Sequence, residues 1–163
     1  MAWDRNSANY PRPVAQFDAT ACWAAGLEWW LRCMQNSRTL IIQLHLIPKF
    51  SAYWEHDDSS DEYGTVTGEN LGHIMDDASI NMRYTVKSTS TWNKDFVNEK
   101  LAISPVLIGY HEPEVNGFHV NVIHSLNDTS TGDVNVMDPN KGRFRTRSHI
   151  RFTTKNYVLG WAK

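Results

Sequence analysis

The chain of 163 residues has no long hydrophobic run and no excess of positive charge. A membrane-spanning helix needs about 20 consecutive apolar residues, and no segment approaches that length, so we expect no membrane partner. Nucleic acids are bound through basic surfaces, whereas 18 Asp and Glu outnumber 16 Lys and Arg here, so we expect no nucleic-acid partner. Residues 1–10 lack the apolar core of a signal peptide, which predicts synthesis in the cytoplasm.

Cysteine is also scarce, since Cys22 and Cys33 are the only two. If both lie on one helix, they are separated by about 16 Å along its axis. A disulfide requires Cα atoms within about 7 Å of each other, so we expect two free thiols in a reducing compartment.

Aromatic residues are plentiful by comparison. They make up 12% of the chain and include seven Trp, and hydrophobic residues make up 41%. This composition excludes an intrinsically disordered chain. It predicts a packed interior with large side chains, or an aromatic binding cleft.

Hydrophobic patterning predicts that helices dominate the first half. Residues 21–35 have only a narrow polar strip, which is typical of a largely buried central helix. Residues 67–78 and 94–102 carry shorter helical stripes. Residues 40–50 are apolar with a period that fits either a helix or a strand.

The second half changes to short strand-like runs separated by turn residues, without long helices between them. Connections this short favour antiparallel pairing. We therefore predict an α+β fold in one domain, residues 1–163, with a helical lobe over about 1–81 and a β lobe over about 82–163. The expected strands are 82–88, 106–110, 118–125, 133–137, 144–152 and 157–161.

An acidic segment between the two predicted helices of the first half raises the question of a metal site. It contains His56, Asp57, Asp58, Asp61 and Glu62. Their spacing matches no recognised zinc or calcium site, so a solvated loop is the simpler interpretation. We expect neither a metal nor another cofactor.

Cys22 lies in the first turn of the predicted central helix. The partial positive charge and free N–H groups of a helix N-terminus favour the thiolate, which is the reactive form of cysteine. Cys22 could equally be a small core residue, as most free cysteines are. Cys33 lies in the middle of the helix and is interpreted as structural.

A thiolate nucleophile needs a proton-transfer partner, and His119 is the best placed of the seven histidines. It begins a strand rich in Val and Ile, while Asp138 ends the next strand and precedes Pro139. If the two strands form a hairpin, His119 and Asp138 lie near the same end of it, and the carboxylate can orient the imidazole. The alternative is that Asp138 only starts a turn. His124 faces away from His119, which disfavours a metal pair.

Gln16 precedes Cys22 by six residues. Acyl transfer through a thiolate creates an oxyanion, which a side-chain amide and a backbone N–H can stabilise together. Taken alone, Gln16 would be read as an ordinary loop residue.

Three segments together resemble the papain-like cysteine proteases. They are CWAA at residues 22–25, GFHV at 117–120 and VNVMDP at 134–139, and Gln16 precedes them in the family's order. The distance from Cys to His is shorter than the ~130–150 residues of papain itself. The resemblance is therefore to the compact bacterial branches, the AvrRpt2-like effector proteases and the bacteriocin-processing peptidases.

Two departures from the pattern of papain matter. The third member is Asp138, where plant and lysosomal papains have Asn, and alanines and a threonine replace the Gly and Ser that usually flank the nucleophile. The bacteriocin-processing branch usually has Gly after its Cys, so Trp23 favours the AvrRpt2-like branch.

The resemblance implies a role for each residue of the site. Cys22 attacks the scissile carbonyl, His119 pairs with the thiolate and then protonates the leaving amine, and Asp138 fixes the tautomer of the ring. Gln16 and the backbone N–H of Cys22 hold the oxyanion, and Trp23 supports the site by packing.

The same resemblance implies a protease that acts on a protein or peptide. Bacterial members of this kind are often secreted toxins or effectors, delivered from the cytoplasm into another cell, and some are paired with an immunity protein. An amidase or deamidase acting on side-chain or peptidoglycan amides would use the same chemistry and stays open. A non-catalytic binding module is a third reading, and the intact Cys22, His119 and Asp138 argue against it.

Overall fold

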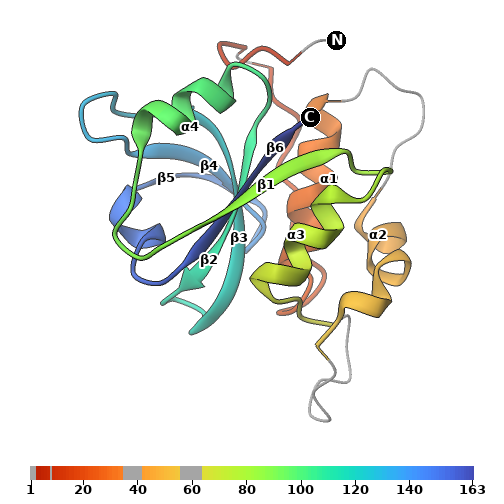
Figure 1. Cartoon of the computed structure of the whole chain (residues 1–163). Coiled ribbons are helices and arrows are strands. Elements are labelled where there is room, and N and C mark those ends of the chain that lie inside the picture. The colour runs from red at the N-terminus through yellow and green to blue at the C-terminus, as the bar shows by residue number, and fades with distance from the viewer. Residues whose placement is uncertain (1–2, 8, 35–41, 56–63) are drawn as a thin grey trace.

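The computed structural model describes residues 3–7, 9–34, 42–55 and 64–163. Most of its helices come early in the chain and all of its strands come late (Figure 1). The helices are α1 (Cys22–Met34), α2 (Gln43–Lys49), α3 (Gly68–Asp76) and α4 (Lys94–Leu101), with 3-10 turns η1 (Ser51–Tyr53) and η2 (His149–Phe152). The strands are β1 (Met82–Lys87), β2 (Val106–Glu112), β3 (Gly117–Leu126), β4 (Val134–Asp138), β5 (Arg143–Arg147) and β6 (Tyr157–Ala162).

The strands form one six-stranded sheet in the order β1-β6-β2-β3-β4-β5. Every neighbouring pair is antiparallel, with β2–β3 and β3–β4 joined as hairpins. This arrangement confirms the predicted α+β class and its antiparallel sheet. The central position of β2 and β3 explains their nearly continuous burial, because both faces are covered.

Helix α1 packs across one face of the sheet at β3. The contact requires a glycine, since a Cβ atom on Gly26 would lie 2.7 Å from Cγ1 of Val120. The core on this face is dominated by α1, α2 and α3 and includes the fully buried Trp23 and Trp29. Close packing here fixes the position of the N-terminal end of α1 relative to β3.

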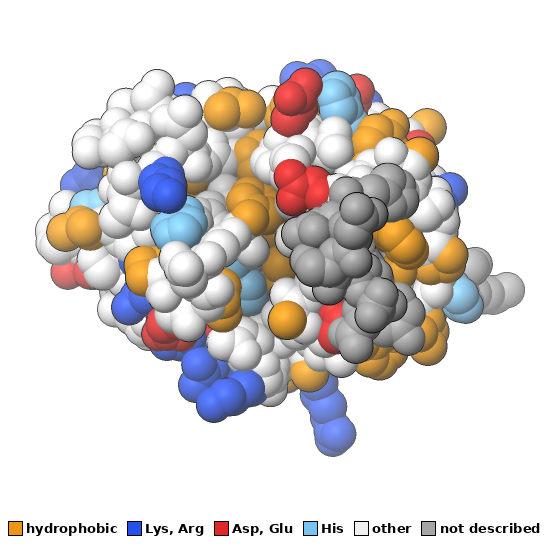
Figure 2. All heavy atoms as spheres, turned by 90° about the horizontal axis from the view of Figure 1, so that it is seen from below, with side chains coloured by type: hydrophobic (Ala, Val, Ile, Leu, Met, Phe, Trp, Pro, Cys, Tyr) orange, Lys and Arg blue, Asp and Glu red, His pale blue; other side chains and the backbone are white. Residues whose placement is uncertain are grey.

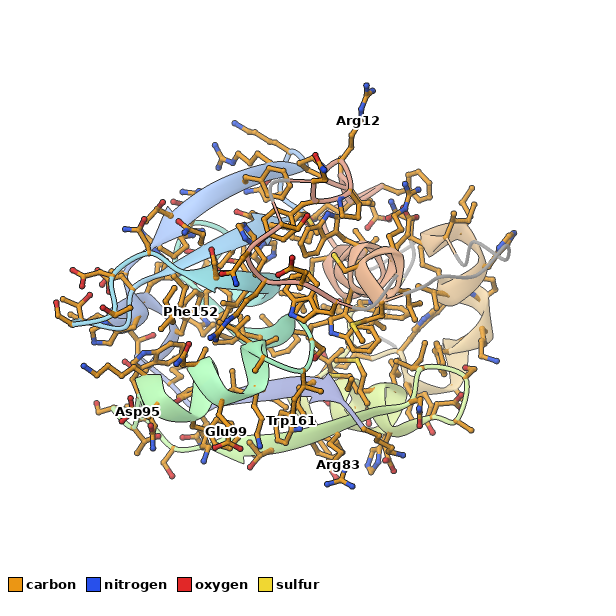
Figure 3. The ribbon with its side chains drawn as sticks, turned by 90° about the horizontal axis from the view of Figure 1, so that it is seen from above. Arg12, Arg83, Asp95, Glu99, Phe152 and Trp161 are labelled. Atoms are coloured by element: carbon orange, nitrogen blue, oxygen red, sulfur yellow. The ribbon has the colours of Figure 1, made fainter. Side chains whose placement is uncertain are left out.

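Helix α4 and η2 cover the opposite face of the sheet, and Figure 1 shows α4 on the other side from α1 and α3. Phe152 of η2 lies in this second core, whereas Arg12 and Arg83 project outward (Figure 3). Trp161 of β6 packs against Phe96 of α4 with ring centroids 5.4 Å apart. The sheet is therefore the middle of three layers.

Two expectations differ from the structure in detail. The run 144–152, predicted as one strand, is split into β5 and η2, because Oδ1 of Asp133 accepts hydrogen bonds from both the backbone N–H and the Nδ1 of His149. Those bonds turn the chain away from the sheet. The ambiguous segment 40–50 contains the helix α2, and its first two residues lie outside the described part of the chain.

Three other sequence features concern the cysteines, membrane-spanning helices and the acidic segment. Cys22 and Cys33 are both free thiols. Within the described residues, no helix has the length and apolar character that crossing a bilayer demands. The acidic segment with His56, Asp57, Asp58, Asp61 and Glu62 lies outside the described residues.

Candidate active site

Cys22 is the first residue of α1 and is 2% exposed. The chain turns into the helix just before it, where Oδ1 of Asp18 accepts hydrogen bonds from both the backbone N–H and the hydroxyl of Thr20, each at 2.7 Å. Cys22 follows as the first residue of the helix, where backbone N–H groups have no carbonyl partner within the helix.

His119 and Asp138 are brought together by the β3–β4 hairpin. Strand pairing of Val122 with Met137 places them near the same end of the ladder. The Nε2 atom of His119 lies 2.7 Å from Oδ1 of Asp138, and both side chains are buried. Hydrogen bonding and charge from the side chain of Cys22 also raise the pKa of the imidazole, which places Cys22 beside the ring. Because Nε2 is occupied by Asp138, Nδ1 is the ring nitrogen that remains for the sulfur.

The two partners of His119 determine its charge. Burial disfavours the imidazolium and lowers its pKa, but hydrogen bonding and charge from Asp138 and Cys22 outweigh burial and raise the pKa of His119 to about 9. The protonated ring is therefore the favoured form at neutral pH. A protonated imidazole can give its proton to a leaving group.

Asp138 is kept ionised although it is fully buried. Burial raises the pKa of its carboxyl group, but hydrogen bonds and charge from His119, together with the N–H of Asn140 and the guanidinium of Arg145, outweigh burial and lower the pKa. The carboxylate can therefore act as a fixed acceptor for the His119 ring.

Arg145 of β5 is a part of the site that the sequence reasoning missed. Its Nη1 lies 3.0 Å from Oδ2 of Asp138, and the same guanidinium binds the carboxylate of Glu114. Arg147 approaches Oδ2 of Asp138 at 3.6 Å. The alternation of arginines at 143, 145 and 147 was the available signal, because it places charges along one face of the strand next to Asp138.

Gln16 lies at the same end of the sheet as His119 and Asp138. Its backbone N–H donates to the carbonyl of Pro139 at 3.0 Å, which ties the loop before α1 to the turn after β4. Its side-chain Nε2 donates to the carbonyl of Asp18 at 2.6 Å, and its Oε1 is buried without a protein partner. An amide nitrogen carries two hydrogens, so one remains for a ligand.

A cleft of about 440 Å³ runs between the two halves of the chain beside these residues. Figure 2 shows a hollow on this face of the molecule with hydrophobic side chains inside it. The cleft is lined by Gln16, Asp18, Ala19, Thr20, Thr65, Val115, Gly117, Phe118, His119, Asn140 and Lys141.

A second hollow of about 460 Å³ adjoins the first, because Phe118 lines both. Its surface is mostly apolar, so it suits hydrophobic side chains of a bound chain. The lining residues are Gly68, Glu69, Tyr84, Val86, Gly109, Phe118, Asn156, Tyr157 and Val158.

Trp23 is fully buried behind the cleft. Its Nε1 donates to the carbonyl of Gly64 at 3.2 Å, and its ring packs edge-on against Phe50. Gly64 precedes Thr65, which lines the cleft, so Trp23 connects α1 to this part of the cleft lining. Among the described residues, no cluster of three or more His, Cys, Asp or Glu could hold a metal ion.

Comparison with known proteins finds matches among solved structures. No family model and no curated protein matches the chain. Among solved structures it is similar to a double-glycine motif protease from an AMS/PCAT transporter, in complex with its leader peptide. The TM-score is 0.56 at 15% identity, covering 99% of this chain and 98% of that one. This similarity confirms the papain-like fold. It does not show the AvrRpt2-like branch that the sequence favours.

Proposed function

We propose that the chain is a papain-like cysteine peptidase with Cys22 as nucleophile, His119 as acid and base, and Asp138 as the residue that orients His119. The observation that carries the proposal is the buried His119 imidazole, which lines a cleft, lies 2.7 Å from Asp138 and has its pKa raised by the neighbouring Cys22 side chain. A thiol, an imidazole and a carboxylate in this order are the groups that acyl transfer through a thioester requires.

In the first half of the reaction, the thiolate of Cys22 forms a bond to the carbonyl carbon of the scissile amide. The carbonyl oxygen becomes an oxyanion, which accepts hydrogen bonds from the Cys22 N–H and the side chain of Gln16. The imidazolium of His119 gives its proton to the departing nitrogen, the C–N bond breaks, and a thioester remains on Cys22.

In the second half, neutral His119 takes a proton from water while the water oxygen attacks the thioester carbon. A second oxyanion forms and collapses, which breaks the C–S bond and releases the acid product. The imidazolium is restored beside the Cys22 thiolate. Asp138 stays ionised throughout and keeps Nε2 of His119 engaged, so that Nδ1 does the chemistry.

A peptide is the substrate class that the hollows favour. Two adjoining cavities offer room for several residues of an extended chain, and one of them is apolar. The similar double-glycine protease was solved with a leader peptide, which supports the same class here. An amidase acting on a single small amide would need less of this surface, so it is the second candidate.

The proposal also covers a biological setting, which rests on the motifs at residues 22–25, 117–120 and 134–139. These motifs favour an AvrRpt2-like effector or toxin, made in a bacterial cytoplasm and delivered into another cell. A cognate immunity protein that covers the cleft is the partner expected in that setting.

The test is incubation of the protein with a peptide library derived from a proteome, followed by mass-spectrometric identification of new termini. Wild type is expected to create new N-termini, and Cys22→Ala to create none while keeping its fold. Cys33→Ala is the matched control and should cleave as wild type does. Conversion of glutamine side chains to acids without chain cleavage would establish the deamidase instead. Cleavage by Cys22→Ala would overturn the assignment of the nucleophile.

A further inference from the structure

The side chain of Gln43, the first residue of α2, is buried against the loop that carries Gln16. Its Nε2 donates to the carbonyl of Ala15 at 2.7 Å, and its Oε1 accepts the N–H of Phe17 at 3.2 Å. One side-chain amide therefore holds both peptide groups that flank Gln16. We infer that Gln43 is a positioning residue for the oxyanion donor, an inference that rests on the proposed function.

Gln43 is itself fixed to the helix that carries the nucleophile. Its backbone N–H donates to Oε1 of Glu28 on α1 at 2.8 Å, and Oε2 of Glu28 pairs with Arg32 at 2.9 Å. The carboxylate satisfies a free N–H at the start of α2. Since α1 begins with Cys22, the same helix fixes the sulfur and, through Glu28 and Gln43, the loop of the oxyanion donor.

The Gln16 backbone has a third attachment on its other side, where its N–H binds the carbonyl of Pro139. The side chain of Gln16 is held at its Nε2, which donates to the carbonyl of Asp18, while its Oε1 has no protein partner. The position of that side chain therefore depends on how firmly the backbone on either side of it is held. Gln43 supplies a hydrogen bond on each side of Gln16.

A hydrophobic residue at position 43 would remove the two hydrogen bonds that Gln43 makes to the Ala15 carbonyl and the Phe17 N–H. Each loss frees the loop to shift, and a displacement of about 1 Å in a catalytic group can cost ~10²-fold in rate. The effect should fall on steps that pass through an oxyanion. Reactions of the Cys22 sulfur that form no oxyanion should keep their rate.

Two small reagents separate these classes of reaction without any need for the natural substrate. Acylation of Cys22 by p-nitrophenyl acetate passes through an oxyanion and releases nitrophenolate as a burst. Alkylation by iodoacetamide forms an S–C bond by displacement of iodide, with no oxyanion. We expect Gln43→Leu to slow acylation by about 10-fold or more. Its alkylation rate should match that of wild type.

The decisive measurement is a double-mutant cycle with Gln16→Ala. If Gln43 acts through Gln16, Gln43→Leu should slow acylation in the wild-type background and have no further effect in Gln16→Ala. An equal slowing in both backgrounds, or an equal slowing of acylation and alkylation, would overturn the inference. The matched control is Asn70→Leu, which removes another side-chain amide bound to a backbone carbonyl, that of Tyr53 in η1.

Gln43→Glu keeps the inference testable if Gln43→Leu does not fold. The carboxylate retains the acceptor for the Phe17 N–H and loses the donor to Ala15, so acylation should fall by less than in Gln43→Leu. Because neither reagent is a peptide, failure of peptide cleavage would refute the peptidase proposal alone. Wild-type acylation in both Gln43 variants would refute the positioning role alone.

Discussion

His119 and Arg145 bind different oxygen atoms of the same buried carboxylate, that of Asp138. The histidine Nε2 lies 2.7 Å from Oδ1, and the arginine Nη1 lies 3.0 Å from Oδ2. Asp138 therefore binds two groups at once. The imidazole of His119 is proposed to gain and lose a proton during the reaction, whereas the guanidinium of Arg145 stays charged. The arginine competes for the negative charge that stabilises the imidazolium.

Arg145→Met is predicted to change the pH dependence of peptide cleavage. Loss of the guanidinium leaves the Asp138 charge to His119, so the pKa of His119 should rise. In the proposed mechanism, peptide cleavage requires the imidazolium, which is lost as pH increases through this pKa. The alkaline limb of kcat/KM should therefore move to higher pH. Arg145→Lys should lie closer to wild type, and Arg83→Met, a change at an exposed arginine, should leave the limb in place. An alkaline limb that moves downward would contradict this account.

Asp138→Asn is predicted to have the opposite effect on pH dependence. The amide keeps the size of the side chain and removes the charge that raises the pKa of His119, so the alkaline limb should move to lower pH. Cleavage at neutral pH should fall by roughly 10²-fold, because less of the enzyme holds the imidazolium that protonates the leaving group. Imidazole NMR of His119 across pH gives the same shift directly. An unchanged titration in this variant would show that Asp138 does not control the ring.

Because His124 is buried, we predict that the free energy of unfolding decreases in acid. Burial among the rings of Tyr10, Trp29 and Phe144 lowers the pKa of His124 to about 4. An unfolded histidine has a pKa near 6.5, so the unfolded chain binds more protons, and the free energy of unfolding falls as pH drops from about 6.5 to 4. The shift corresponds to at most about 3 kcal/mol.

Urea unfolding at pH 7 and at pH 4.5 measures this effect. His124→Gln should lose part of the difference in unfolding free energy between the two pH values. His45→Gln, at an exposed histidine, serves as the control and should retain the whole difference. If His124→Gln keeps the full pH dependence, other groups are responsible for it.

Gly26→Ala is predicted to disturb the contact between α1 and β3. The added Cβ would lie 2.7 Å from Cγ1 of Val120, so the helix and strand must move apart. We expect a loss of about 1–3 kcal/mol in the free energy of unfolding, measured by urea denaturation. Because α1 carries Cys22 and β3 carries His119, the rate of peptide cleavage should fall as well. Gly26→Ala combined with Val120→Ala should recover part of both losses; the idea fails if the pair is simply additive.

The sequence was sufficient for the parts of the fold that depend on local patterns. The narrow polar strip of residues 21–35 predicted a buried helix, and α1 is that helix. The juxtaposition of His119 with Asp138 was foreseeable because one turn joins their strands as a hairpin, although the sequence did not reveal the register shift between Ile123 and Ser125. Strand β5 was predicted too long, since the bond between Asp133 and His149 that ends its run is not a local signal.

Gln43 and Arg145 could not be recognised in the same way. Gln43 acts on residues 15–17 across an intervening helix, and no periodic pattern connects the two segments. Arg145 was visible as one of several alternating charges, but its contact with Asp138 depends on how β5 pairs with β4. Polar contacts between distant segments are decided by the packed fold and leave little trace in the order of residues.

The position of β6 determines when, during synthesis of the chain, the proposed active site can form. Although residues 157–162 are the last strand of the sheet to be synthesised, they pair with both β1 and β2 and fill the gap between them. In a growing chain that lacks them, β1 is not joined to β2 and the sheet is interrupted between these two strands. Cys22 is translated long before β6. We therefore expect its proposed activity to appear only after β6 has left the ribosome and paired with β1 and β2.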